Sequence, residues 1–161
     1  MARKLPGTFV GSLIAVADQL AQAPGPAAYR QASMRRAVSS AYYALFHTLC
    51  TLCADELVGW SKTSNLPPIY RSLDHGVALK KLRSREAKQI DPAIERISAL
   101  FENLQENRHL ADYAPPSALF SRMQTLALIE EARDAIALIE GLASKARLQL
   151  AILLLARQRA A

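Results

Sequence analysis

The stretch Arg35–Cys53, RRAVSSAYYALFHTLCTLC, decides the fold of this chain. Apolar side chains recur at helical spacing around most of its circumference, and a helix with that pattern is normally covered by neighbours on several sides. We therefore predict that this stretch belongs to a central helix running from about residue 27 to residue 57. The apolar positions are Met34, Val38, Ala41, Tyr42, Leu45, Phe46, Leu49 and Leu52.

The same helix also carries a polar stripe, whose four members follow one another at i, i+4, i+7 and i+11. This spacing stacks side chains on one face of a helix. Burying polar groups without partners costs roughly 1–3 kcal/mol each, so the stripe needs polar neighbours. The sequence offers them in RHLADY, Arg108–Tyr113, and we predict that the two stretches form the functional site. The stripe consists of Arg36, Ser40, Tyr43 and His47.

The composition favours a single all-α domain over residues 1–161. Alanine and leucine dominate, glycine is scarce, and alternating β-branched runs are absent. A chain of 161 residues is long enough to bury a substantial hydrophobic core. We expect the core of the domain in about residues 8–143, followed by a C-terminal helical extension over about 144–159.

Prolines divide the chain into helical stretches, because proline is tolerated in the first turn of a helix but not in its interior. Asp74 is predicted to cap a new helix start within the third stretch. Asp91 and Pro92 are predicted to begin the helix that carries RHLADY, since aspartate suits the cap and proline the first helical position. The predicted helices cover about residues 8–23, 27–57, 69–83, 92 onward and 117–157.

Two further features of the chain are open to more than one interpretation. Gly141 is a weak break in the last helix, beyond which Leu148–Leu155 is more apolar than one surface helix needs. This segment either completes a self-association face or lies back on the bundle. Trp60, in the loop after the central helix, is predicted to cover the end of the core rather than to stack on a ligand.

Arg108 occupies an unusual place in its predicted helix, because it falls within the apolar stripe that runs from Ile94 to Ala111. A guanidinium there keeps its charge, so it must be paired or face a polar cleft. Two interpretations are open. Arg108 either forms a structural ion pair with Asp112, four residues later, or binds an anion.

The net charge of +6 is concentrated in residues 1–90. A basic patch favours polyanionic partners, nucleic acid first, although a run of charges is also what a solvated helix face contains. We treat the densest basic cluster as a candidate surface for unspecific attraction of nucleic acid. Its members are Lys80, Lys81, Arg83, Arg85 and Lys88.

Several classes of site are not indicated. The N-terminus lacks a long apolar region followed by a cleavage site, and the apolar run Leu150–Ala156 is too short to span a bilayer, so we expect a cytoplasmic protein without a membrane partner. Cys50 and Cys53 lie in mid-helix, where no helix N-terminus activates a thiol, and with His47 they would make a poor tetrahedral metal site. We expect buried thiols, no metal and no cofactor.

Three motifs in order resemble one branch of the HEPN domain superfamily. They are AYYALFH of Ala41–His47 with Arg36 and Ser40 before it, DHGV of Asp74–Val77, and the R-x-x-A-D-Y of Arg108–Tyr113. The resemblance implies an up-down bundle of four to five helices, often dimeric, in prokaryotic RNA-targeting or toxin–antitoxin systems. It also implies binding of RNA or nucleotides, or metal-independent cleavage of RNA, and a possible nucleotidyltransferase-type antitoxin as partner.

The chain departs from the catalytic motif of that superfamily, an arginine followed four to six residues later by a histidine. Tyr113 stands where the histidine is expected, and a phenol with a pKa near 10 is a poor base at neutral pH. His109 points to a different face from Arg108. Acid–base chemistry would therefore have to come from His47 or His75, on other helices.

Three hypotheses follow. In the first, a HEPN-like dimer binds RNA or nucleotide phosphates in a cleft. Arg108 contacts a phosphate there, and Asp112 orients the Arg108 side chain. In the second, Arg108 with His47 or His75 cleaves RNA without a metal. In the third, the polar residues form a buried network that fixes helix register. The proposed binding residues are Arg36, Ser40, Tyr43, His47, Arg108, Asp112 and Tyr113, assisted by Lys80, Lys81, Arg83 and Arg85.

Overall fold

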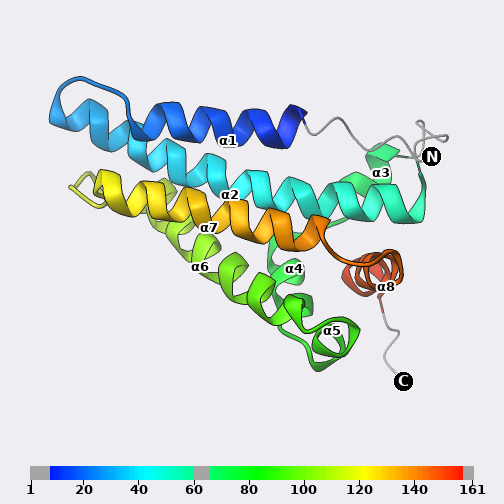
Figure 1. The fold of residues 1–161 in the computed structure, drawn as a ribbon. Coiled ribbons are helices and arrows are strands. Elements are labelled where there is room, and N and C mark those ends of the chain that lie inside the picture. The colour runs from blue at the N-terminus through cyan, green and yellow to red at the C-terminus, as the bar shows by residue number, and fades with distance from the viewer. Residues whose placement is uncertain (1–7, 60–65, 158–161) are drawn as a thin grey trace.

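The computed structural model describes residues 8–59 and 66–157, which form eight α-helices and no strand (Figure 1). The all-α helical bundle predicted from the sequence is therefore confirmed. The helices are α1 (Thr8–Ala21), α2 (Ala27–Leu57), α3 (Leu66–Tyr70), α4 (His75–Leu82), α5 (Arg85–Ile90), α6 (Ala93–Tyr113), α7 (Arg122–Glu140) and α8 (Ser144–Leu155).

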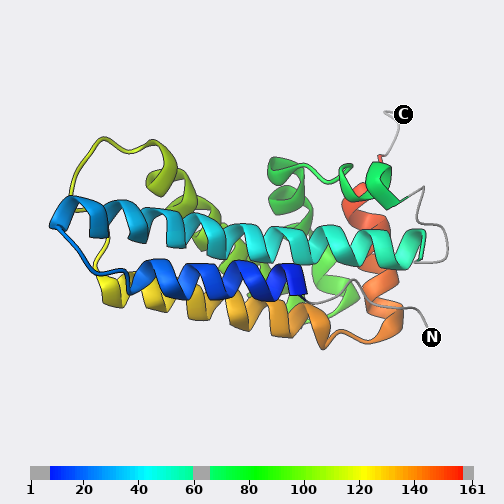
Figure 2. The same cartoon turned by 90° about the horizontal axis from the view of Figure 1, so that it is seen from above.

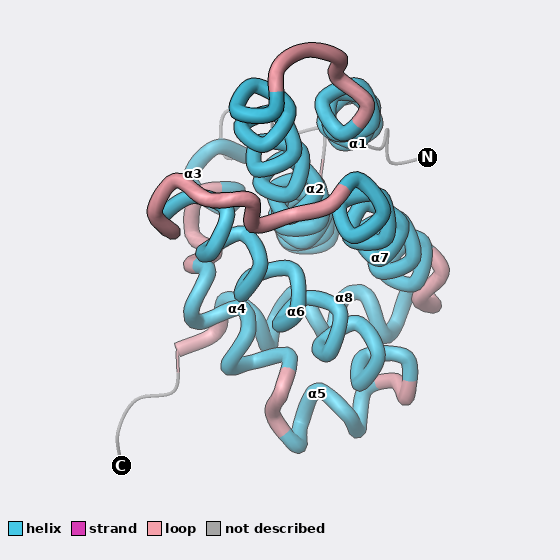
Figure 3. Tube along the Cα trace, turned by 90° about the vertical axis from the view of Figure 1, so that its left-hand side faces the viewer, coloured by secondary structure: helices cyan, strands magenta, loops and turns pink. Residues whose placement is uncertain are grey.

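Helix α2 is the central element, and its bounds agree with the predicted ones. Helices α1 and α7 run alongside it, and α6 crosses obliquely beneath (Figures 1 and 2). Seen from its end, the bundle has α1, α2 and α7 on one side and α4, α5, α6 and α8 on the other (Figure 3). Among the described helices, α2 alone is long and apolar enough to cross a membrane, but 78% of its apolar window is buried. It is thus built as a core helix.

Local capping explains where the helices begin and end. Gly59 adopts φ +73°, a left-handed conformation that favours glycine, and its N–H bonds the Ala54 carbonyl at the end of α2. The predicted cap of α4 is confirmed, since Asp74 accepts hydrogen bonds from the N–H groups of Gly76 and Val77. At α6 the carboxylate of Asp91 accepts from the Ala93 N–H over 2.8 Å, so the helix starts one residue after the predicted position.

The predicted C-terminal helix is two helices, not one. Helix α7 ends at Glu140, and the chain turns at Gly141, where an added Cβ would lie 3.2 Å from the Ala137 carbonyl oxygen. Helix α8 then packs on α2, α4 and α5 and buries Leu150 and Leu154. Of the two interpretations of this apolar segment, the structure supports the one in which it lies back on the bundle.

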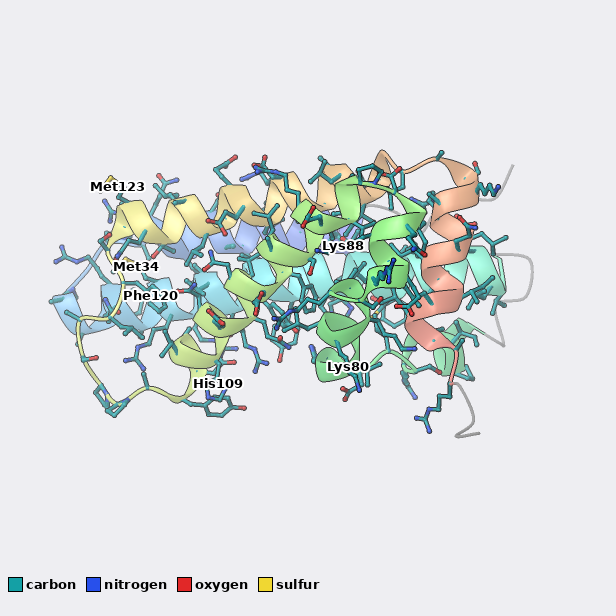
Figure 4. All side chains as sticks on the ribbon, turned by 90° about the horizontal axis from the view of Figure 1, so that it is seen from below. Met34, Lys80, Lys88, His109, Phe120 and Met123 are labelled. Carbon is teal, nitrogen blue, oxygen red and sulfur yellow. The ribbon has the colours of Figure 1, made fainter. Side chains whose placement is uncertain are left out.

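The start of α7 also differs from the prediction, because residues 114–121 form a loop and Ser121 begins the helix with a capping box. Gln31 holds this loop by accepting from two backbone N–H groups and donating to the Phe120 carbonyl. Arg35 donates to the carbonyls of Ala114 and Pro115. Because it holds the loop through these two carbonyls, Arg35 has a structural role. Figure 4 shows Met34, Phe120 and Met123 gathered at this end of the bundle.

Smaller differences complete the comparison with the predicted helices. Helix α1 ends at Ala21 rather than Ala23, and a helix that the sequence did not predict, α5, is capped by the Ser84 side chain. The predicted stretch over 69–83 is divided into α3 and α4 at the expected break. Trp60 and residues 158–159 of the predicted extension lie outside the described residues.

Candidate functional site

Residues of α2 and α6 meet around the carboxylate of Asp112. The Ser39 hydroxyl donates to Asp112 Oδ1 over 2.5 Å. Arg108 Nη1 lies 3.6 Å from Asp112 Oδ2, and Arg36 Nη1 lies 3.6 Å from Oδ1. The i, i+4 spacing of Arg108 and Asp112 places both side chains on one face of α6. Since one carboxylate serves two guanidinium groups, a net positive charge remains.

The guanidinium of Arg108 is nearly enclosed, yet the protein uses little of its hydrogen-bonding capacity. Its side chain is 15% exposed, and Cζ lies 5.1 Å from the centre of the Tyr42 ring, a cation–π contact. Its Nε is buried without a hydrogen-bond partner among the described residues. The separation from Asp112 is that of an ion pair, longer than a hydrogen bond. The described residues therefore leave the Nε donor of Arg108 without a hydrogen-bond partner.

Tyr42 connects this arginine to His75. The Tyr42 hydroxyl and His75 Nδ1 are 2.7 Å apart, and the Phe46 ring stacks on the imidazole with centroids separated by 3.7 Å. His75 is the first residue of α4, whose start is fixed by the Asp74 cap, and Gln105 of α6 donates to its carbonyl. We call Arg36, Ser39, Tyr42, His75, Arg108 and Asp112 the Arg108 cluster.

The protonation states in the cluster follow from burial and from the arginine. Burial raises the pKa of Tyr42 far above its usual value, so its hydroxyl stays protonated. Burial and then the Arg108 charge lower the pKa of His75, outweighing the opposite effect of Asp74. His75 is therefore neutral at pH 7. When the Tyr42 hydroxyl donates to Nδ1, the proton of the imidazole is on Nε2, where it can be donated to an anion.

His47 lies outside the Arg108 cluster. Its Nδ1 is hydrogen-bonded to the Tyr70 hydroxyl of α3, and its ring packs edge-on against Phe9 of α1. Burial lowers the pKa of His47. The rings of Tyr43 and Phe46 each contact both histidines and stand between the two environments. Of the two predicted histidines, the structure brings His75, not His47, to Arg108.

The remaining predicted site residues are distributed around the cluster. Ser40, on the same stripe as Arg36, is half-buried, whereas its neighbour Ser39 is the one that bonds Asp112. Tyr113 is 68% exposed and contacts the His109 ring, with centroids 4.9 Å apart. Tyr113 therefore does not share the environment of Arg108, although it follows Asp112 directly.

The basic residues of α4 and α5 are partly neutralised within the chain. Arg83 pairs with Glu102 and Lys88 with Glu95, each at 3.0 Å, and Lys81 donates to the Ala156 carbonyl. Lys80 and Arg85 are exposed. Figure 4 shows Lys80 at the same edge of the view as His109, whereas Lys88 lies toward the middle of the molecule. Two of the five basic residues of the predicted cluster are thus paired with carboxylates of α6.

Two members of the cluster were not predicted as site residues. Tyr42 was assigned to the apolar face of α2, and Ser39 was not assigned a role. Their spacing was the available signal, because positions i and i+3 of α2 share a face. Arg108 and Asp112 share a face of α6 in the same way. A phenol and a hydroxyl on the packed face of α2 are the partners that these two charges require.

We expect acidification to destabilise the protein. His47 and His75 have lowered pKa values when folded, while histidine in an unfolded chain titrates near 6.5. As the pH falls through about 6.5, the unfolded chain takes up protons that the folded chain does not, so stability present above this pH is lost below it. Urea unfolding midpoints at about pH 7.5 and pH 5.5 measure the difference.

The matched variants for this measurement are His75→Asn and His109→Asn. The first should reduce the pH dependence, because it removes one buried titrating group. The second removes an exposed histidine and should leave the pH dependence nearly as in the wild type. Equal pH dependence in the wild type and in His75→Asn would contradict the assignment of His75 as a buried neutral group.

No protein-family model, curated protein or solved structure matches this chain.

The described residues contain no group of three or more His, Cys, Asp and Glu side chains placed to hold a metal ion. Cys50 and Cys53 are buried, and burial raises the pKa of each thiol to about 12, so both are protonated at neutral pH. The side chains of the Arg108 cluster themselves supply hydrogen bonds, charge and a neutral histidine.

Proposed function

We propose that the Arg108 cluster binds the phosphate groups of RNA or of a nucleotide. The observation that supports this proposal best is the state of Arg108: a nearly enclosed guanidinium with a buried Nε that has no partner among the described residues. Buried polar atoms are rarely left unpaired, and a planar guanidinium matches a phosphate group in two parallel hydrogen bonds.

The surroundings of Arg108 favour an anion as the missing partner. Arg36 and Arg108 share the single carboxylate of Asp112, so a positive charge is left over. The neutral imidazole of His75 offers a donor in the tautomer that accepts from Tyr42. An incoming phosphate would thus meet two kinds of donor, the guanidinium groups and the imidazole.

The biological setting that we propose is a HEPN-like protein of a prokaryotic toxin–antitoxin or RNA-targeting defence system. The order of the three sequence motifs and the all-α bundle support it. In that setting the protein would act as a homodimer, with a nucleotidyltransferase-type antitoxin as a possible partner. Lys80 and Arg85, exposed on α4 and α5, would add unspecific attraction to RNA.

Arg108→Gln should weaken binding of single-stranded RNA by at least about tenfold, the loss expected for charge-assisted hydrogen bonds. Its melting temperature should stay near that of the wild type, because Asp112 retains Ser39 and Arg36 as partners. Fluorescence anisotropy with a labelled RNA of mixed sequence, repeated at several salt concentrations, provides the measurement. The slope of log affinity against log salt should fall by about one.

Arg96→Gln is the control, because Arg96 is an exposed arginine of the same helix and pairs with Asp134. It changes the net charge equally and should leave affinity almost unchanged. If both variants weaken binding to the same small extent, the interaction is general attraction to a basic protein. If Arg108→Gln unfolds far below the wild type, the arginine has the structural role that the third hypothesis assigned to it.

Metal-independent cleavage of RNA is a second candidate function, and the proximity of His75 to Arg108 through Tyr42 favours it. A neutral histidine beside a phosphate-binding arginine has the groups needed to move a proton and stabilise charge during attack by the 2′-hydroxyl. The test is incubation of the RNA in EDTA. Cleavage by the wild type that is lost in both Arg108→Gln and His75→Asn would identify an enzyme, whereas intact RNA leaves binding as the function.

A further inference from the structure

A cavity of about 390 Å³ lies where helices α1, α2, α3, α7 and α8 converge. This is the region of Figure 1 where the C-terminal ends of α2 and α7 approach α8. Cavities of this size hold small organic ligands when a mostly apolar lining is combined with a few polar groups. The apolar lining consists of Phe9, Val10, Ile14, Leu52, Ile136, Ala137 and Ile139.

One end of the cavity carries buried charges. Arg147 Nε donates to Glu56 Oε1 over 2.9 Å, and Arg147 Nη2 lies 3.8 Å from Asp55 Oδ2. Asp55 is 12% exposed, and its second oxygen, Oδ1, is buried with no hydrogen-bond partner among the described residues. Asp55, which lines the cavity, therefore has an acceptor without a donor among the described residues.

The charges around this end do not balance. Two carboxylates, Asp55 and Glu56, share the single guanidinium of Arg147, and Glu140 adds a third acidic group to the lining. Arg133, the other basic residue of the lining, is already paired with Asp18 and Glu130. The cavity is thus locally acidic, although the chain carries a net charge of +6.

The position of the acidic pair at the end of α2 strengthens this imbalance. Asp55 and Glu56 lie in the last turn of α2, which contains no basic residue. The C-terminal end of a helix carries a partial negative charge, so carboxylates there are unfavourable and a cation is favoured. A positively charged donor in the cavity would relieve both the charge imbalance and the unpaired oxygen.

We propose that this cavity binds a small primary amine with an apolar body. The ammonium group donates to Asp55, and the apolar body occupies the space between α1 and α7. The three Thr and Tyr hydroxyls of the lining supply further acceptors: Thr48, Thr51 and Tyr70. The site shares no residue with the Arg108 cluster, so it goes beyond the proposed phosphate-binding function and is independent of it.

Gly11 provides a way to close the cavity without disturbing the fold. It lines the cavity from α1, and a Cβ added there would meet no atom within 4 Å. Replacing a glycine inside a helix by a residue of higher helix propensity also stabilises the helix. Gly11→Leu should therefore fill the cavity while keeping the protein folded.

The test compares three probes that share an aromatic body and differ in charge: 2-phenylethylamine, 2-phenylethanol and 3-phenylpropanoate. Calorimetry and thermal shift should show the amine binding at least about tenfold more tightly than the alcohol, with no detectable binding of the carboxylate, because a charge-assisted hydrogen bond is much stronger than a neutral one. Alkylamines of increasing chain length, tested on the same protein, establish how long the body can be.

Three variants make the result specific. Asp55→Asn should remove the preference for amine over alcohol, and Gly11→Leu should abolish binding of both while melting no lower than the wild type. Glu95→Gln removes an exposed carboxylate that pairs with Lys88 outside the cavity and should bind like the wild type. The proposal is overturned if no amine of the panel binds, if amine and alcohol bind equally, or if binding survives in Asp55→Asn or Gly11→Leu.

Discussion

Replacing Arg147 by methionine is expected to lower the free energy of unfolding by about 3 kcal/mol, the lower part of the range for breaking a buried ion pair. The Arg147 side chain is 15% exposed and is the cation for two carboxylates, Asp55 and Glu56, that are themselves largely buried. It also donates to the Ile139 carbonyl near the end of α7. The variant leaves two buried negative charges without a counterion.

Urea unfolding monitored by circular dichroism measures this loss, and two further variants interpret it. Arg133→Met removes an arginine that bridges Asp18 and Glu130 in a more exposed position, and it should cost less than about 1 kcal/mol. Combining Arg147→Met with Asp55→Asn and Glu56→Gln should recover most of the lost stability, because removing a whole buried ionic group costs less than breaking it. Equal losses in Arg147→Met and Arg133→Met would contradict the assignment of a buried ionic group.

Local signals in the sequence explain why most of the fold was predicted. Proline and aspartate set the starts of α4 and α6 within one residue, because caps act on the first turn of a helix and need no tertiary information. The apolar circumference of Ala27–Leu57 likewise required a central position for α2.

The corner between α7 and α8 was not predicted, because glycine alone only weakly disfavours a continuous helix. The spacing of apolar residues continues across Gly141, and Leu150 and Leu154 would fit a single long helix as well as two. The surface that α2, α4 and α5 offer to α8 decides between one continuous helix and two. No local sequence pattern contains this information. Distant contacts therefore determine the path of the chain after Gly141.

The candidate site was predicted only in part for a similar reason. The i, i+4 relation of Arg108 and Asp112 is visible in the sequence. The rotation of α2 about its axis, which determines which of its residues face this pair, is not. A shift of one residue turns a helix position by about 100°, so Ser39 rather than Ser40 reaches Asp112. The pairing of Arg147 with Glu56, 91 residues apart, had no sequence signal at all.

Asp112→Asn should change stability and RNA affinity in opposite directions. Asp112 contacts both Arg36 and Arg108, and its side chain is 17% exposed. Without its charge, Arg108 is an uncompensated and nearly enclosed cation, so the free energy of unfolding should fall by about 2 kcal/mol. The asparagine can still bond the Ser39 hydroxyl, which limits the loss to the charge.

The same change should strengthen RNA binding by roughly tenfold at low salt, because the two arginines no longer share an anion with the incoming phosphate. Unfolding in urea and RNA anisotropy on one preparation measure both effects, and Asp134→Asn, which removes the exposed carboxylate partner of Arg96, is the control. If affinity fell together with stability, Asp112 would instead be needed to orient Arg108 toward the phosphate. If neither quantity changed, the ion pairs around Asp112 would contribute nothing to the fold or to the site. Opposite changes are the result that only a competition between Asp112 and a bound phosphate for the same arginines explains.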